Sequence, residues 1–302
     1  MGNETYHFKV GNFECVALSD GTHTYAPPIF PPPPTFLFID APKERLAQKL
    51  KEHNLQRRQW AEWVSPYVCL LIKAGKHIVL VDTGAGGLGP NTGHLLQNLR
   101  SENIPAESID TVILTHGHPD HIGGNTNDEG KLTFSNARFV MWKEEWDFWN
   151  SEQALKLDEH SRDVLLAIAR KNLLPLRSQL ETVDLETEIM HGIRAIAAPG
   201  HTPGHMALTI SSKNEKLLVS SDAFLHPIHV EQPEWHAMVD FAPQQVTSTR
   251  HRLFALAAAS KVLVLAFHFT FPGLGYIVPK GKQWRWQPLL EGSNNRNREP
   301  RC

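Results

Sequence analysis

Short apolar runs, separated by glycine, asparagine or charged residues, recur along most of this chain. Short apolar or alternating runs bounded by turn residues are typical of β-strands. In the first half of the sequence the pattern predicts strands over residues 7–10, 14–18, 67–72, 77–82, 111–114 and 137–142. In the second half it predicts strands over residues 193–198, 206–211, 216–221 and 262–267.

Segments with apolar residues at helical spacing lie between these strands. They predict a helix capped by Asp40 and further helices over residues 94–102, 143–150, 153–171 and 247–260. Strands at both ends of the chain with helices between them favour a layered α/β sandwich over a simple βαβ array. No internal repeat or linker interrupts the pattern, so a single domain over residues 1–302 is expected.

A proline-rich stretch, residues 27–34, follows the first predicted hairpin. Such a stretch is stiff and extended, and it has two interpretations: a ligand for an SH3-type domain, or a loop that covers the fold. The covering loop is favoured, because the apolar side chains of Phe30 and Phe36 flank the prolines.

The charge balance and the histidine content of the chain indicate which classes of function to expect. The 30 lysine and arginine residues against 32 acidic ones leave no global electrostatic case for binding nucleic acid or an anionic membrane. No apolar run reaches the roughly 18 residues that cross a bilayer, and the start shows no secretory-signal pattern.

The cysteines, Cys15, Cys69 and Cys302, form no Cys-x-x-Cys pair, so a reduced, cytoplasmic protein is expected. The 17 histidines exceed what packing alone requires.

The densest histidine cluster is Thr115-His-Gly-His-Pro-Asp-His-Ile-Gly-Gly124, directly after the predicted strand over residues 111–114. Its candidate ligands are His116, His118, Asp120 and His121. On a loop at the end of a strand, such neighbouring side chains can converge from different directions. Imidazole nitrogens and a carboxylate oxygen suit zinc or a similar divalent ion. A merely polar loop is disfavoured, because burying these groups without an ion would leave costly unsatisfied atoms.

This motif resembles the hallmark of the metallo-β-lactamase superfamily, His-x-His-x-Asp-His after an apolar strand. Later segments match the superfamily's further motifs in order: Pro199-Gly-His-Thr-Pro-Gly-His205, Leu217-Leu-Val-Ser-Ser-Asp222 and Leu265-Ala-Phe-His268, with Val81-Asp-Thr-Gly84 as the early strand-end motif. The resemblance implies a four-layer αβ/βα sandwich. We therefore expect a hairpin and covering loop over residues 1–65, a motif-bearing core over 66–278, and a tail over 279–302.

The resemblance also implies a centre with two divalent metal ions per chain, joined by a hydroxide that attacks the substrate. The implied ligands are His116, His118 and His201 for one ion, Asp120, His121 and His268 for the second, and Asp222 as a bridge. Asp120 would also serve in catalysis. Zinc is favoured, although iron, manganese and cobalt share these ligands. Asp82 is expected to orient a ligand histidine, and His205 is interpreted as structural.

Residues around the last two motifs are similar to a narrower branch of the superfamily. Residues 221–226 and 268–276 resemble methyl parathion hydrolase and its N-acyl homoserine lactonase relatives. That resemblance implies hydrolysis of a small-molecule lactone or ester, with phosphotriester hydrolysis as the alternative. It also allows a homodimer, because relatives commonly form dimers.

One position departs from the lactonase pattern. Some bacterial lactonases of this superfamily carry a tyrosine three residues after the bridging aspartate, whereas this sequence has Leu225 there. The nearest polar candidate is His226, whose imidazole could protonate a departing alkoxide as a general acid. The alternative is that His226 only packs against the metal loops.

A second possible function, that of an NAD-binding oxidoreductase, is suggested by Gly84-Ala-Gly-Gly-Leu-Gly89. These residues have the glycine spacing of a dinucleotide-binding fingerprint. That fingerprint requires a helix opening at the glycines and an acidic residue at the end of the next strand. Here residues 90–93 interrupt the pattern, and the next strand leads into Thr115 and His116. The glycines are therefore interpreted as part of the active-site rim.

Overall fold

The computed structural model describes residues 4–55, 60–156, 165–259 and 261–289, whose strands form two seven-stranded sheets. The first sheet runs in the order β1 (Thr5–Val10), β2 (Phe13–Tyr25), β3 (Trp63–Ala74), β4 (His77–Val81), β5 (Thr111–Leu114), β6 (Arg138–Trp142) and β7 (Leu180–Val183). The second runs in the order β14 (Gln283–Pro288), β13 (Leu274–Lys280), β12 (Leu263–Leu265), β11 (Glu215–Val219), β10 (Met206–Ser212), β9 (Ile193–Ala197) and β8 (Glu188–Met190).

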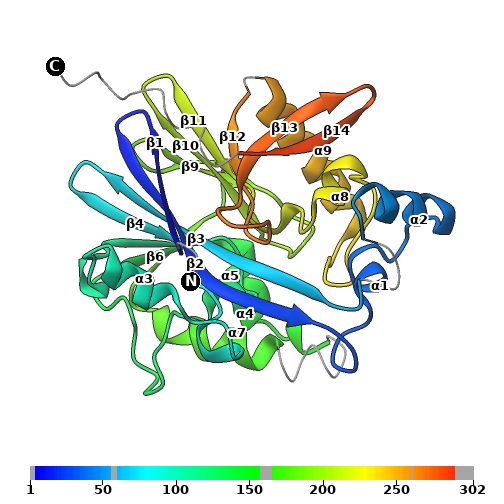
Figure 1. Ribbon diagram of the computed structural model, residues 1–302. Helices are drawn as coiled ribbons and strands as arrows, with labels where there is room; N and C mark the ends of the chain where they lie inside the picture. Colours follow the sequence, from blue (N-terminus) through cyan, green and yellow to red (C-terminus); the bar gives the residue numbers. More distant parts are fainter. Residues whose placement is uncertain (1–3, 56–59, 157–164, 260, 290–302) are drawn as a thin grey trace.

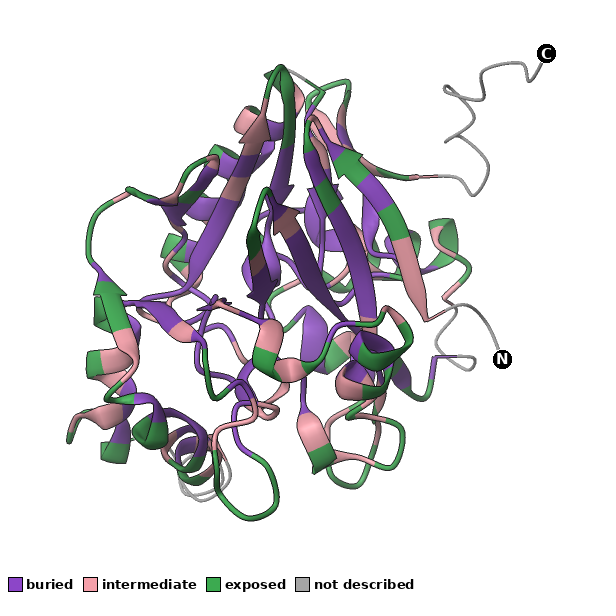
Figure 2. Ribbon diagram, turned by 90° about the vertical axis from the view of Figure 1, so that its left-hand side faces the viewer, coloured by how far each residue is buried: buried purple, intermediate pink, exposed green. Residues whose placement is uncertain are grey.

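Interior strands such as β3 and β10 have buried side chains on both faces of their sheets, since successive residues of a strand point to opposite faces. On β3, Leu70 and Ile72 pack in the core between the sheets, whereas Leu71 packs in a second core under helices. The helices outside the first sheet are α3 (Leu95–Ser101), α5 (Lys143–Asn150) and α7 (Ala167–Leu173), and α9 (Pro243–Ala259) covers the second sheet (Figure 1). Figure 2 shows the buried positions along the strands. The predicted four-layer αβ/βα sandwich is confirmed.

A cap of short helices lies at one side of the sandwich, beside the ends of β2 and β3 (Figure 1). Its helices are α1 (Pro33–Leu37), α2 (Lys43–Glu52) and α8 (Pro227–Glu231). They share a separate apolar cluster that includes Phe36, Leu50, Trp60, Ile228 and Trp235. Main-chain hydrogen bonds also tie residues 36 and 39 to residues 238 and 236. The cap therefore joins an early and a late segment of the chain.

Several short elements differ from the sequence-based expectations. In the proline-rich stretch over residues 27–34, α1 begins at Pro33, and α2 begins after Pro42 without an Asp40 cap. Ile29 and Phe30 of this stretch line the cavity described below. Residues 279–288 of the predicted tail belong to the second sheet, because β13 ends at Lys280 and β14 follows as its antiparallel partner, and the rest of that prediction, from residue 290, lies outside the described residues. Part of the helix predicted over residues 153–171 lies outside the described residues. No helix in the described ranges combines the length and apolar character needed to cross a membrane.

An ion-pair cluster stabilises the cap. Glu231, whose side chain is 8% exposed, accepts hydrogen bonds from Lys49 Nζ at 2.6 Å and from the His53 ring at 3.0 Å. Burial alone would raise the pKa of Glu231, but the hydrogen bonds from His53 and Lys49 outweigh burial and lower this pKa from 4.5 to about 2. A carboxyl group whose pKa is lowered on folding stabilises the fold above its unfolded pKa and loses that contribution as the pH falls.

Replacing Glu231 with Gln is therefore expected to lower the free energy of unfolding by about 1–2 kcal/mol at pH 7, after allowance for screening by solvent. The difference from the wild type should shrink below pH 4.5 and vanish near pH 2. Urea unfolding at a series of pH values measures it. Glu234→Gln is the matched control, because Glu234 pairs with Arg45 on the surface at 3.4 Å. A difference that stays constant from pH 7 to pH 3 would refute the assignment.

Candidate metal centre

The predicted ligands lie at the ends of strands from both sheets. His116 and His118 follow β5, and the chain then makes one helical turn, α4 (Pro119–Ile122), that carries Asp120 and His121. The sequence predicted only a loop here. His201 lies in the turn between β9 and β10, whereas Asp222 and His268 follow β11 and β12. Because β11 and β12 are parallel neighbours, the residues at their carboxyl ends meet at one edge of the sheet.

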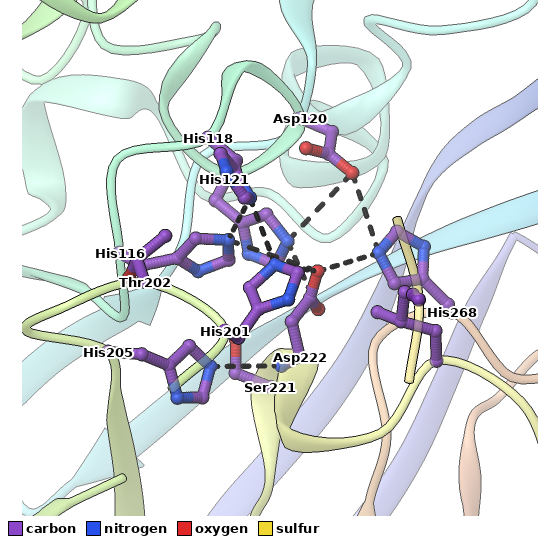
Figure 3. A network of polar contacts seen from close by, with 12 residues as sticks. His116, His118, Asp120, His121, His201, Thr202, His205, Ser221, Asp222 and His268 are labelled. Atoms are coloured by element: carbon purple, nitrogen blue, oxygen red, sulfur yellow. Dashed lines mark hydrogen bonds and ion pairs between the residues drawn. The ribbon is translucent and has the colours of Figure 1, made fainter. Parts of the chain in front are cut away.

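The structure brings all seven predicted ligands together (Figure 3). They form two groups whose donor atoms lie within 4.8 Å of one another: His116, His118, His201 and Asp222, and Asp120, His121, Asp222 and His268. Asp222 belongs to both groups. Its Oδ2 lies 2.9 Å from His268 Nε2 and 3.4 Å from His201 Nε2, while its Oδ1 lies 3.3 Å from His121 Nε2.

Polar partners behind the histidines fix the directions of their rings. The Nδ1 atoms of His121, His201 and His268 lie 2.8 Å from Asp82, Asp240 and Ser65, respectively, and His116 Nδ1 lies 3.2 Å from the Thr115 hydroxyl. Each of these rings therefore presents Nε2 to the centre, which is how outer partners orient metal-binding histidines. The expectation for Asp82 is confirmed, since it also accepts hydrogen bonds from the Thr115 amide and hydroxyl.

Three imidazole nitrogens in the first group converge in a way that hydrogen bonds cannot satisfy. His118 Nδ1 lies 3.0 Å from His116 Nε2 and 2.9 Å from His201 Nε2. The Nδ1 atoms of His116 and His201 donate to other partners, so both Nε2 atoms carry lone pairs, and His118 Nδ1 can offer at most one proton. Burial, and then the neighbouring imidazoles, lower the pKa of His116 and of His118 well below the usual value, so both rings are neutral.

Further buried atoms in the cluster lack a hydrogen-bond partner, among them His121 Nε2 and Asp222 Oδ1. Converging lone pairs and an anionic oxygen without donors are costly when buried. A divalent cation satisfies such a set, because neutral imidazole and carboxylate are the protonation states that bind metal. The residues present therefore fit a metal centre.

His205 has both ring nitrogens engaged outside the centre. Its Nδ1 lies 2.9 Å from the Ala198 carbonyl oxygen, and its Nε2 accepts a hydrogen bond from the Asp222 amide at 3.1 Å (Figure 3). This geometry agrees with the structural interpretation. His205 holds the main chain of Asp222, and it has no nitrogen left to offer an ion.

A cavity of about 380 Å³ opens over the centre. Among the described residues its apolar wall consists of Ile29, Phe30, Phe36, Trp63, Leu88, Leu165, Ile168, Leu225 and Val239. Tyr25 and Tyr67 also line it, and their hydroxyls are 2.8 Å apart. Burial raises the pKa of both tyrosines well above that of a free phenol, so both are neutral donors. The sequence did not identify this pair, which is brought together only by the pairing of β2 with β3.

His226 lies away from the cavity, contrary to the role of general acid. It is not among the residues that line the cavity, and its ring packs against Trp60 and Phe38 in the cap. Its Nδ1 accepts a hydrogen bond from the Ile228 amide at the start of α8. Burial, and then His53, lower the pKa of His226 to about 3, so the ring is neutral near pH 7 and has no readily released proton.

The glycine motif after β4 contributes Leu88 to the lining of the cavity, although none of its glycines lines it. Residues Gly86–Leu88 make a single 3₁₀ turn, and the next α-helix begins only at Leu95. A dinucleotide fingerprint needs a helix that opens at the glycines, so this segment does not form one. Leu88 and Thr92 line the cavity instead.

Comparison with known proteins agrees with the fold and the site. Residues 63–268 match the Metallo-beta-lactamase superfamily. The solved structure of AidC, a dizinc quorum-quenching lactonase, has a TM-score of 0.85 at 28% identity and covers 95% of this chain and 97% of its own. The hydrolase AbOPH has a TM-score of 0.85 at 27% identity, with 96% and 99% covered.

The matches to curated sequences cover less of this chain. An N-acyl homoserine lactonase of Bacillus thuringiensis is 22% identical over 224 residues, which are 67% of this chain and 81% of the relative. YobT of Bacillus subtilis is 26% identical over 161 residues, 53% of this chain, and the match spans only 62% of that relative's length. Since the family match covers more than half of the chain and includes every predicted ligand, this protein belongs to the metallo-β-lactamase superfamily of hydrolases.

Proposed function

We propose that this protein is a binuclear metallohydrolase that opens a small-molecule lactone or cleaves an ester. The observation that carries the proposal is the pair of donor groups that share Asp222 at the base of an apolar cavity. His116, His118 and His201 would hold one ion, Asp120, His121 and His268 would hold the other, and Asp222 would contact both. The likeness to AidC supports a lactone as substrate.

Two divalent ions at this centre would lower the pKa of a water molecule and polarise the oxygen of the scissile group. Side chains of the protein would handle protons, donate hydrogen bonds and bind the substrate. Asp120, whose side chain is 13% exposed, presents its carboxylate at the cavity and can hold a proton there during the reaction. One hydroxyl of the Tyr25–Tyr67 pair donates to the other, and the remaining hydroxyl proton can be donated to a substrate oxygen. The apolar wall binds the rest of the substrate and excludes water.

The charge of the cavity wall limits the substrate class. No lysine or arginine is among the described residues that line it, whereas Asp120 and Asp222 are. Away from the proposed metal ions, an anionic substrate would find no cationic side chain on this mostly apolar wall to pair with, so the wall favours uncharged substrates. Phosphotriesters are uncharged, and phosphotriester hydrolysis is therefore the second candidate.

The deciding experiment measures metal content and substrate preference in the same preparation. Protein purified without chelator is expected to contain close to two divalent ions per chain by elemental analysis. It should hydrolyse uncharged lactones or aryl esters, with phosphotriesters slower and phosphate monoesters inert, and chelation should abolish the activity. A single ion under metal-replete conditions, or turnover that survives complete chelation, would overturn the proposal.

A further inference from the structure

A fully buried carboxylate outside the metal-binding motifs joins two segments that carry candidate ligands. Glu145 lies on α5, and its side chain has no exposed surface. Its Oε1 accepts hydrogen bonds from the Gly117 amide at 2.8 Å and from Trp149 Nε1 at 2.7 Å. Its Oε2 accepts hydrogen bonds from the Thr202 hydroxyl at 2.7 Å and from the Gly204 amide at 2.9 Å. One side chain therefore ties the loop after β5 to the turn between β9 and β10.

The two glycines show how closely these segments approach α5. A Cβ atom on Gly117 would lie 2.3 Å from Trp149 Nε1, and a Cβ atom on Gly204 would lie 2.1 Å from the backbone nitrogen of Glu145. Neither position has room for a larger residue. The Trp149 ring, which Glu145 also holds, meets the His118 ring edge to face at 5.9 Å between centroids.

We propose that Glu145 is a positioning residue for the donor group of His116, His118, His201 and Asp222, and that it sets the affinity of this group for its ion. The inference rests on the metal centre proposed above. Gly117 lies between His116 and His118, and Thr202 directly follows His201. Fixing these two stretches of main chain fixes where the imidazoles project, although Glu145 touches neither ion nor substrate.

The selectivity of this role follows from where the hydrogen bonds go. The hydrogen bonds of Glu145 go to Gly117, Thr202 and Gly204, which flank the histidines of the first group, and to Trp149. None of these bonds goes to α4, the turn that carries Asp120 and His121, or to the segment of His268. Four donors occupy both oxygens fully, since a carboxylate oxygen has two lone-pair sites. A residue that only stabilised the fold would instead affect both donor groups alike.

Glu145→Gln tests the proposal. The amide nitrogen of glutamine cannot accept a hydrogen bond, so it is expected to occupy the Oε2 position, where the Thr202 hydroxyl can rotate and accept from it. The Gly204 amide then has no acceptor, and the turn that carries His201 loosens. Affinity for one of the two equivalents of Co²⁺ should fall by about 10- to 100-fold, as for other outer partners of metal ligands. The other equivalent should bind as in the wild type.

Titration of the metal-free protein with Co²⁺, followed by its visible absorption and a competing chelator, measures both affinities without using activity. Glu144→Gln is the matched control, because Glu144 is the exposed neighbour on the same helix. Thr202→Val provides a second variant that keeps the carboxylate and removes one donor, with an expected loss of a few-fold, about the worth of one hydrogen bond.

Unchanged affinities in Glu145→Gln and Thr202→Val would overturn the inference. So would an equal loss at both equivalents together with a lower melting temperature of the metal-free protein, which would indicate a purely structural role. If Glu145→Gln does not fold, Thr202→Val decides. A wild-type protein that binds fewer than two equivalents would overturn the proposed function itself, which is a separate result.

Discussion

Asp222→Ala is expected to weaken the binding of both metal ions and to lower kcat/KM by about 10²–10⁴-fold. Among the residues that the structure describes, Asp222 alone belongs to both donor groups, with Oδ2 near His201 and His268 and Oδ1 near His121. If losing this contact weakens each site by about 10–100-fold, the product of the two losses gives the expected range. Elemental analysis and steady-state kinetics, both at the same limiting concentration of free metal, measure the two effects.

Asp120→Ala is the variant to compare with Asp222→Ala, because Asp120 belongs to one donor group only and its loss should affect one ion. It should lose the ion of that group preferentially and reduce turnover by at least about 10²-fold, through loss of nucleophile activation. Two results would contradict the scheme: retention of both ions in Asp222→Ala, or near-native turnover in Asp120→Ala.

Asp240→Asn is expected to destabilise the metal-free protein by about 3–5 kcal/mol, the cost of leaving a buried charge without its partner. Asp240 pairs with Arg250 at 3.3 Å, and both side chains are fully buried. Burial alone would raise the pKa of Asp240, but the hydrogen bond from His201 and the charge of Arg250 lower this pKa to about 2. The Asp240 carboxyl group is therefore ionised. Asparagine can still accept from His201, but its amide group would face the guanidinium.

The measurement is urea unfolding of the metal-free protein, which separates stability from metal affinity. Glu186→Gln serves as the control, since Glu186 and Arg252 form an ion pair of similar type with exposed side chains. The control should change stability by no more than about 1 kcal/mol. Equal, small effects in both variants would show that Arg250 is satisfied by its three carbonyl acceptors alone.

The ligand set could be predicted from the sequence because each ligand lies within a short motif at the end of an apolar strand. The four motifs occur in a fixed order, and strand ends define where their side chains emerge. The residues behind the ligands carry no such signal. Asp240 and Ser65 contact His201 and His268 from 39 and 203 positions away, so only the folded chain reveals them.

The elements that the sequence missed are short or lie at an edge. The five-residue helices α1 and α8 are too short for helical periodicity to show. In β14, Trp284 and Trp286 alternate with polar residues, so the strand lacks a continuous apolar run. His226 was chosen for its closeness to Asp222 in sequence, but α8 begins directly after it and turns the ring into the cap.

Each donor group draws ligands from both sheets. In the first group His116 and His118 follow a strand of one sheet, and His201 and Asp222 follow strands of the other, and the second group is divided in the same way. Neither group is complete until the two halves of the sandwich have docked. Bound ions would therefore act as cross-links between the halves, and each tenfold rise in free metal above the dissociation constant would add about 1.4 kcal/mol per site against their separation.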